Sequence, residues 1–345
     1  MKIGLITYHH SINYGAVMQS YATCRALREL GHEVELINIE QPEKKSSRSF
    51  IFYFKLKAFR RFMQQFYPQE TCVFHSLEEL RAHKFNYDCL IVGSDQVWNP
   101  DISKDKCMAY FLAFGDEKTK RLSYASSYGI ERWDDEKRSL LEQINKALRK
   151  FHAISVREAT GAVLTKSLFG LEASVVLDPT LLHSRYDEIT GPFEENHKIV
   201  GYLLNRTPVQ IEKSIALARE LGAKPIMIST IWYTKGFTYV YPPSIERWIR
   251  YIGGSRFVIT DSFHGVAFSI IYRRNFLVIT PENGKNSRLR DLLSTCELMD
   301  RYFTDSDEIP YKDIVNVDID YNRVYELLNK QKEFSWNYLK ENLND

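Results

Sequence analysis

One histidine has the placement that proton-transfer chemistry needs. The stretch 257–273 reads FVITDSFHGVAFSIIYR, which predicts a strand, a sharp turn and the start of a helix. Such a turn places backbone N–H groups at the carboxyl edge of a parallel sheet, where open α/β sheets bind ligands. His264 lies in the first turn of the predicted helix. An imidazole side chain can accept or donate a proton near neutral pH. The alternative is a hydrogen-bonded structural histidine, with Thr260, Asp261 and Ser262 acting only as helix caps.

Two other turn-rich loops follow predicted strands and carry side chains suited to a polar substrate. The candidate residues are Asn13, Tyr14 and Gly15 in the first loop, and Ser94, Gln96 and Trp98 in the second. Trp98 is expected to stack on the face of a sugar ring, and Gln96 to hydrogen-bond the sugar. The alternatives are that Gly15 only permits a tight turn, and that the second loop is an interdomain packing turn.

Metal and nucleotide cofactors are not expected. His9 and His10 resemble a metal-binding pair, but adjacent side chains on a strand point to opposite faces, which argues against one shared ion. The five cysteines are odd in number and show no CxxC spacing, which predicts reduced thiols rather than a disulfide framework or a zinc site. No GxGxxG motif follows the first strand, so nothing supports bound NAD or FAD.

The composition narrows the class of protein. The chain has 345 residues, a length that favours two domains. Its 46 Lys and Arg balance 44 Asp and Glu, which argues against a general nucleic-acid binder. The chain begins directly in strand-like residues, and no apolar run approaches the ~18 residues of a membrane span. We therefore expect a cytoplasmic protein.

The order of the predicted elements indicates an α/β protein with two Rossmann-like domains facing a cleft. Strand, helix and strand patterns over 2–39 form a βαβ unit, and this alternation continues through a first domain at 1–183. A polar linker leads to a second alternating domain at 199–320. A terminal helix at 321–345 is expected to pack across the domains.

A basic, aromatic segment near 44–87 interrupts the first domain and predicts an inserted helix. On a helix over Phe50–Tyr67, aromatic residues share one broad face and cations lie largely away from it. They are Phe52, Phe59, Phe62 and Phe66, with Lys57, Arg60 and Arg61 as the cations. Such a helix can lie on an anionic membrane, which predicts a peripheral contact. The alternative is that the aromatic face packs on the first domain.

The motifs, taken in chain order, resemble those of the polysaccharide pyruvyl transferases. They are NYGAVMQ at 13–19, GSDQVWN at 93–99, SYASSYG at 123–129, ISVRE at 154–158, LDPTLL at 177–182, TDSFHG at 260–265 and NSRL at 286–289. The resemblance implies a fold like that of two-domain GT-B glycosyltransferases. It also implies transfer of pyruvate from phosphoenolpyruvate onto two hydroxyls of one sugar, which forms a cyclic ketal and releases phosphate.

The resemblance implies a site as well. His264 would transfer a proton, and candidate substrate-binding residues in the matching motifs include Asp261, Ser262, Gly265 and Asn286. The acceptor would be a surface polysaccharide or its lipid-linked precursor. Phosphoenolpyruvate is the donor substrate, so no separate cofactor is expected.

One departure from the family pattern concerns the anion-binding residue. Better-characterised members carry Arg two residues before the matching histidine, where this chain has Ser262. We expect Arg288 to substitute first, because it opens a helix after a loop, and Arg157 second, because it follows a strand at a carboxyl edge. The alternative for each is a surface or interdomain ion pair.

Two other functions stay open at this stage. A nucleotide-sugar glycosyltransferase on the same fold would need a diphosphate cradle and a base or ribose pocket in the second domain, where only backbone turns offer one. A non-catalytic glycan-binding member would have kept the cleft and lost the arginine.

Overall fold

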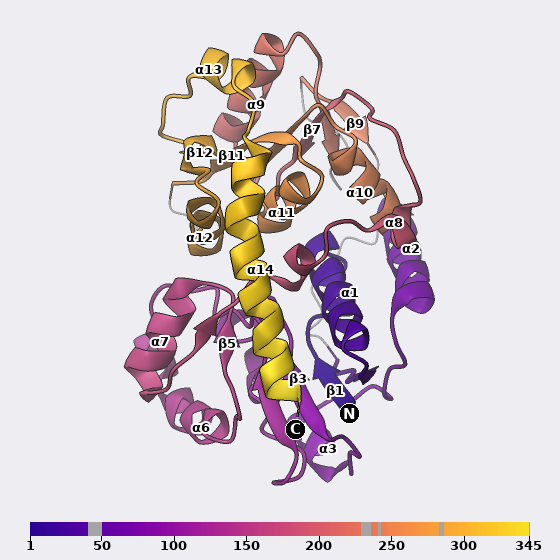
Figure 1. The fold of residues 1–345 in the computed structure, drawn as a ribbon, viewed down its shortest axis with the longest axis vertical. Coiled ribbons are helices and arrows are strands. Elements are labelled where there is room, and N and C mark those ends of the chain that lie inside the picture. The colour runs from indigo at the N-terminus through magenta and orange to yellow at the C-terminus, as the bar shows by residue number, and fades with distance from the viewer. Residues whose placement is uncertain (41–49, 229–235, 241–242, 283–285, 345) are drawn as a thin grey trace. The chain divides into compact units, whose positions relative to one another are not determined.

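The chain folds into two compact units, and each is described here by itself. The computed structural model describes residues 1–40, 50–228, 236–240, 243–282 and 286–344. Unit 1 comprises Met1–Ser46, Gln65–Leu182 and Lys330–Asp345, and unit 2 comprises Ser47–Gln64 and His183–Asn329 (Figure 1).

Unit 1 is built on a parallel sheet in the order β2-β1-β3-β4. The strands are β1 (Lys2–Ile6), β2 (Glu33–Leu36), β3 (Cys89–Val92) and β4 (Lys120–Ser123), and β5 (Ser155–Val156) pairs in parallel with β6 (Ser174–Val175). The helices are α1 (Tyr14–Glu29), α3 (Leu77–Ala82), α4 (Pro100–Ser103), α5 (Cys107–Tyr110), α6 (Arg138–Leu148) and α7 (Ala159–Phe169), with 3-10 turns η1 (Lys104–Lys106), η2 (Asp135–Lys137) and η3 (Pro179–Leu182).

The core of unit 1 covers both faces of this sheet. Ile3 and Leu5 of β1 belong to one apolar cluster, whereas Ile6 belongs to another. Cys89 and Ile91 of β3 likewise pack with the first cluster. Because successive side chains of a strand point to opposite faces, each cluster covers one face, as is usual for parallel sheets. Because both faces are covered, a ligand would reach this sheet at its edges.

Unit 2 has a second parallel sheet, in the order β12-β11-β10-β7-β8-β9. The strands are β7 (Ile199–Tyr202), β8 (Ile226–Ile228), β9 (Thr238–Val240), β10 (Phe257–Thr260), β11 (Asn275–Thr280) and β12 (Tyr302–Thr304). The helices are α8 (Asp187–Thr190), α9 (Pro208–Glu220), α10 (Ile245–Gly253), α11 (Phe263–Ile271), α12 (Ser287–Thr295) and α13 (Tyr311–Asn316), with the 3-10 turn η4 (Met299–Arg301). The predicted alternation of strands and helices is therefore present in both units.

The terminal helix α14 (Tyr321–Leu343) has contacts in each unit. In unit 2, the Tyr321 hydroxyl donates to the carbonyl oxygen of Arg274 at 2.5 Å. In unit 1, the Tyr338 hydroxyl donates to the carbonyl oxygen of Ser123 at 3.0 Å. Within the described part of the chain, no helix combines the length and apolar character that crossing a membrane requires.

Helix α2 (Phe50–Phe66) is the predicted basic, aromatic helix, and part of its aromatic face is buried. Phe59 and Phe62 are fully buried, whereas the side chain of Phe52 lies outside the described residues. Burial leaves Phe59 and Phe62 no surface to insert into lipid, so the packing alternative describes this face. Residues Ser47–Gln64 are grouped with unit 2, whereas Phe66 is half-buried and lies edge-on to Tyr21 of α1 in unit 1, with the ring centroids 5.9 Å apart. The exposed cations are Lys57, Arg60 and Arg61.

Candidate functional site

The turn around His264 has the predicted strand–turn–helix form. β10 ends at Thr260, and α11 begins at Phe263 after the N-cap Ser262. The Ser262 hydroxyl accepts the backbone N–H of Gly265 at 3.4 Å, which satisfies a donor of the first helical turn. The Thr260 hydroxyl accepts the Ser262 N–H at 3.0 Å and donates to the carbonyl oxygen of Tyr202 at 2.7 Å. Thr260 therefore fixes the turn to the end of the neighbouring strand β7.

Close packing explains the glycine that follows the histidine. A Cβ atom at position 265 would overlap the Thr260 hydroxyl, so a larger residue would displace the turn. The His264 side chain is 8% exposed, and its ring lies edge-on to Phe263 with the centroids 5.2 Å apart. The structure thus places His264 in a well-fixed, nearly water-excluded position at the carboxyl edge of β10.

Asp261 holds neighbouring loops in place at this edge of the sheet. Its carboxylate accepts the backbone N–H groups of Leu204 and Asn205 at 2.6 and 2.9 Å, the Asn205 amide at 2.8 Å and the Gln210 amide at 3.3 Å. These bonds join the turn after β10 to the turn after β7. We interpret Asp261 as the residue that holds two edge loops together, not as a direct ligand of substrate.

Arg206 lies in the loop that Asp261 holds, and the sequence analysis did not select it. Its backbone is in the left-handed region with φ of 52°, a conformation that is uncommon for non-glycine residues. Partial burial lowers the pKa of its guanidinium, an effect that the negative charge of Asp261 opposes. The sequence signal that could have identified Arg206 is its position directly after the predicted strand that ends near residue 204. Arg157 was selected by the same criterion, because it also follows a strand.

Asn286 and Arg288 flank the start of α12, after β11. The Asn286 amide donates to the carbonyl oxygen of Pro281 at 3.4 Å, and Arg288 is half-buried in the first turn of the helix. Part of the preceding loop, at 283–285, lies outside the described residues. Because β7, β10 and β11 are neighbours, the loops carrying Arg206, His264 and Arg288 leave the same edge of the sheet.

In unit 1, Arg157 is part of a buried ion-pair cluster. Its side chain is 2% exposed, and Nη1 lies 2.9 Å from Asp178 Oδ2. Nη2 lies 3.7 Å from Asp95 Oδ1, and Nε lies 4.0 Å from Glu158 Oε2. The single positive charge of this guanidinium thus offsets part of the negative charge of three carboxylates in its own unit. The prediction that Arg157 binds substrate is replaced by a structural role, because its charge is already committed inside the fold.

Two residues of the GSDQVWN loop, at 93–99, are buried and have structural contacts inside unit 1. Trp98 is fully buried, its Nε1 donates to the carbonyl oxygen of Tyr110 at 2.9 Å, and its ring stacks on Phe111. The predicted stacking of Trp98 on a sugar is therefore wrong, since no face of the ring is exposed. Ser94 is also fully buried, and its hydroxyl donates to Asp178 Oδ2 at 3.0 Å.

Gln96 and the first loop remain at the carboxyl edge of the unit 1 sheet. Gln96 is half-buried, and its Oε1 accepts from the Asn99 amide at 3.1 Å. Asn13 is the exposed N-cap of α1, and its Oδ1 accepts the Gly15 N–H at 2.9 Å. Tyr14 and Gly15 are buried in the first helical turn. The binding roles of Asn13, Tyr14, Gly15 and Gln96 stay predictions.

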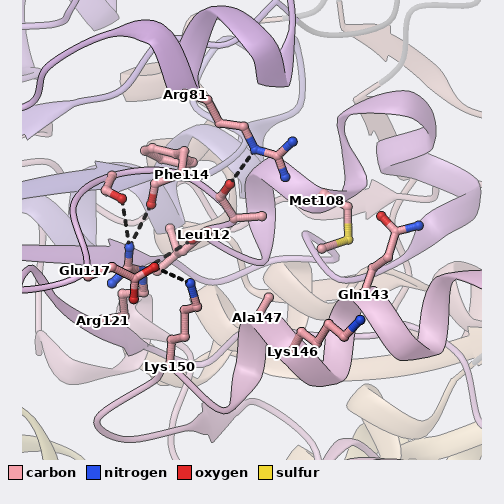
Figure 2. Close-up of a pocket in the computed structure, with 12 residues that line it drawn as sticks. Arg81, Met108, Leu112, Phe114, Glu117, Arg121, Gln143, Lys146, Ala147 and Lys150 are labelled. Carbon is pink, nitrogen blue, oxygen red and sulfur yellow. Dashed lines mark hydrogen bonds and ion pairs between the residues drawn. The ribbon is translucent and has the colours of Figure 1, made fainter.

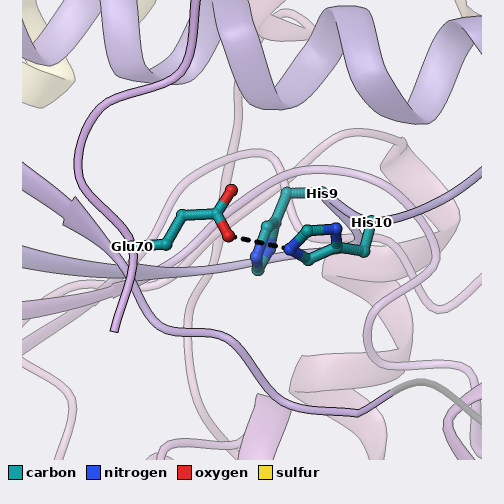
Figure 3. A group of neighbouring side chains, drawn as sticks. All are labelled: His9, His10 and Glu70. Atoms are coloured by element: carbon teal, nitrogen blue, oxygen red, sulfur yellow. Dashed lines mark hydrogen bonds and ion pairs between the residues drawn. The ribbon is translucent and has the colours of Figure 1, made fainter. Parts of the chain in front are cut away.

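His9 and His10 do not lie on a strand, contrary to prediction. β1 ends at Ile6, so these residues lie in a turn and not on a strand. The imidazole centroids are 4.6 Å apart, and His10 Nε2 lies 2.8 Å from Glu70 Oε2 (Figure 3). Burial, reinforced by the charge of His10, lowers the pKa of His9 to about 4, which keeps this imidazole neutral at pH 7.

A separate cavity of about 380 Å³ lies beside the amino end of β4 (Figure 2). Two of its cations already have partners: the Arg121 guanidinium donates to the carbonyl oxygen of Phe114 at 2.9 Å, and Lys150 pairs with Glu117 at 2.6 Å. None of the predicted site residues is among the described residues that line it. They are Arg81, Met108, Leu112, Ala113, Phe114, Gly115, Glu117, Arg121, Gln143, Lys146, Ala147 and Lys150.

Comparison with sequence families identifies a match over most of the chain. A family model described as polysaccharide pyruvyl transferase matches residues 13–283. The matched region includes His264, Arg206 and both edge loops of unit 1, but not Arg288. No sequence among curated proteins matches the chain.

Solved structures similar to the chain share its fold at low sequence identity. The UDP-GlcNAc 2-epimerase of Neisseria meningitidis, bound to UDP-GlcNAc, has a TM-score of 0.56 and 9% identity over 99% of each chain. Spinosyn rhamnosyltransferase SpnG has a TM-score of 0.53 and 11% identity over 100% of each chain. UGT89C1 of Arabidopsis thaliana has a TM-score of 0.54 and 8% identity over 98% of each chain. These likenesses confirm the predicted α/β, GT-B-like fold and show the fold alone.

Proposed function

Because this chain belongs to the polysaccharide pyruvyl transferase family, we propose that it transfers pyruvate from phosphoenolpyruvate to two hydroxyls of one sugar. The product is a cyclic ketal, and inorganic phosphate is released. The acceptor is a surface polysaccharide or its lipid-linked precursor. The observation that carries this proposal is the grouping of His264, Arg206 and Arg288 on loops from neighbouring strands of one sheet edge.

The reaction requires proton transfers that balance. Carbon 3 of phosphoenolpyruvate gains a proton and becomes a methyl group, which leaves positive charge at carbon 2. One sugar hydroxyl attacks carbon 2 and loses its proton, which balances the proton gained by carbon 3. The bond between carbon 2 and the phosphate oxygen then breaks, the second hydroxyl adds to carbon 2, and its proton leaves with the phosphate. His264 is the group that we assign to proton transfer, because an imidazole both accepts and donates a proton near neutral pH.

The donor also requires fixed positive charge. Phosphoenolpyruvate carries a carboxylate and a phosphate, and arginine binds both groups through paired N–H donors. Ser262 cannot supply this charge, since its hydroxyl caps α11. We assign anion binding to Arg206 and Arg288, which replaces the earlier pairing of Arg288 with Arg157. Partial burial of both side chains would strengthen their attraction for an anion.

Replacing Arg206 by alanine is expected to weaken phosphoenolpyruvate binding by about 10–100-fold, since a charged hydrogen bond contributes about 1.5–3 kcal/mol. Arg206→Lys should restore little of the affinity where the contact is bidentate. Isothermal titration calorimetry with phosphoenolpyruvate measures both variants.

Arg290→Ala is the matched control for this substitution. Arg290 is exposed on α12, with its guanidinium 5.3 Å from the centre of the Tyr302 ring. Its loss should leave the affinity unchanged. Parent-like affinity in Arg206→Ala would remove Arg206 from the site.

Product analysis distinguishes this function from its alternatives. Purified protein is incubated with phosphoenolpyruvate and a panel of hexose glycosides and lipid-linked glycans, and phosphate is measured. Acceptor-dependent phosphate release supports pyruvyl transfer. Release of UDP from a nucleotide sugar under the same conditions would indicate a glycosyltransferase, and glycan binding without turnover would indicate a non-catalytic member.

A further inference from the structure

Three side chains from two separate segments of unit 1 converge beyond the end of β1. One ring nitrogen each from His9 and His10 and a carboxylate oxygen of Glu70 lie within 4.8 Å of one another (Figure 3). Glu70 is brought there by a parallel bridge between its backbone and Leu36 at the end of β2. We propose that His9, His10 and Glu70 form a binding site for a divalent transition metal ion, with Zn²⁺ as the fitting example.

The hydrogen bond of the His9 ring leaves its Nε2 atom available to bind a metal ion. Its Nδ1 lies 3.0 Å from the carbonyl oxygen of Thr7, an acceptor, so Nδ1 carries the ring proton. Nε2 then presents a lone pair, and among the described residues this buried nitrogen has no hydrogen-bond partner. A backbone carbonyl that orients a histidine in this way is the usual outer contact of a metal-binding imidazole. His9 is 1% exposed, so water does not compensate the orphan atom.

Asn38 lies close enough to complete the ligand set. Its amide nitrogen is 3.1 Å from His10 Nε2 and 3.4 Å from Glu70 Oε2. While no ion is bound, His10 Nε2 donates its proton to Glu70, so the Asn38 amide faces a nitrogen that cannot accept its proton. An ion that binds His10 Nε2 displaces this proton into solvent. Turning the amide over would place its oxygen at this position, where it becomes a fourth ligand atom.

The donor set favours zinc over magnesium or calcium. Two imidazole nitrogens and one carboxylate oxygen match the ligands of catalytic zinc sites, whereas magnesium and calcium prefer oxygen ligands alone. Bonds of about 2.0–2.1 Å in a tetrahedron separate neighbouring ligand atoms by roughly 3.3 Å. The observed separations, from 2.8 Å for His10 and Glu70 to at most 4.8 Å, bracket this value. Small side-chain rotations would therefore close the site around an ion.

The site is open to entry and independent of the proposed transfer chemistry. His10 and Glu70 are partly exposed, with side-chain exposures of 39% and 25%, so an ion reaches them from solvent. His9, His10 and Glu70 leave one tetrahedral position, which is filled either by the Asn38 oxygen or by an oxygen of water or of a bound molecule. None of the residues assigned to phosphoenolpyruvate in unit 2 takes part, so failure of either proposal leaves the other standing.

Zinc binding to the full-length chain tests the proposal. The protein is stripped with a chelator, dialysed, and titrated with Zn²⁺ in competition with a chromophoric zinc indicator. The expected result is one Zn²⁺ per chain. His10→Ala and Glu70→Gln are each expected to weaken binding by at least about tenfold, since even the loss of an outer-shell partner has this effect. Both side chains are partly exposed, so these variants should fold, which circular dichroism verifies.

Two control variants separate this site from adventitious binding. His75→Ala removes a histidine from another His–Glu pair, in which Nδ1 lies 2.9 Å from Glu40 Oε2. Cys72→Ser removes an exposed thiol two residues from Glu70. Both variants are expected to bind Zn²⁺ like the parent.

Three results would overturn the proposal. They are absence of Zn²⁺ binding by the parent, unchanged affinity in folded His10→Ala and Glu70→Gln, and loss of binding in Cys72→Ser. Substitution of Co²⁺ for Zn²⁺ adds a second readout, because its visible absorption should appear in the parent and disappear in His10→Ala.

Discussion

Replacing His264 by alanine is expected to lower the rate of acceptor-dependent phosphate release by about 10²–10⁴-fold, the contribution of a positioned acid–base group. The fold should survive, because the loops around His264 are held by Asp261 and Thr260 and not by the imidazole. Steady-state phosphate release and circular dichroism of the variant and the parent measure the two effects.

A matched control uses the same substitution elsewhere in unit 2. His197 is exposed, and His197→Ala should retain the parent rate. His264→Asn offers a second test that keeps a polar side chain in the buried position. If either His264 variant folds and turns over near the parent rate, the proton-transfer role is lost.

Replacing Arg157 by alanine is expected to lower the free energy of unfolding by about 3–5 kcal/mol, the usual cost of removing one partner from a buried ion pair. The guanidinium is 2% exposed and faces carboxylates of Asp178, Asp95 and Glu158. Without it, these carboxylates repel one another in a largely buried site. Urea denaturation followed by circular dichroism measures the change.

An exposed ion pair of unit 1 serves as the control for the Arg157 substitution. Lys146 pairs with Glu142 at 2.6 Å on the surface of α6, and Lys146→Ala should cause no resolvable change in stability. Arg157→Lys should recover part of the loss, since it restores the charge but not the fork of donors. A small effect of Arg157→Ala would contradict the buried cluster and reopen its assignment to substrate binding.

The elements around His264 were predictable because their signals are local. An apolar β-branched run, cap residues and an apolar helical face lie within seventeen consecutive positions, and the structure has β10, the N-cap Ser262 and α11 in this order. The alternation of strands and helices gave the fold class for the same reason. Periodicity along the chain reports which face of an element is buried.

The failures concern burial and long-range contacts, which local patterns do not report. Trp98 has the same sequence context whether its ring stacks on a sugar or on Phe111. The partners of Arg157 include Asp178, which follows a different strand. The strand argument at His9 and His10 failed because β1 ends before them, and element ends are the least certain part of a sequence-based prediction.

Transfer of labelled pyruvate tests the central claim most directly. Phosphoenolpyruvate labelled with carbon-13 at carbon 2 is incubated with the protein and the acceptor panel, and the glycans are analysed by NMR and mass spectrometry. We predict that the label appears as a quaternary ketal carbon bonded to two oxygens of one sugar, with one phosphate released for each ketal formed. Phosphate release with no label in any glycan, or glycosyl transfer from a nucleotide sugar in its place, would contradict the proposed function.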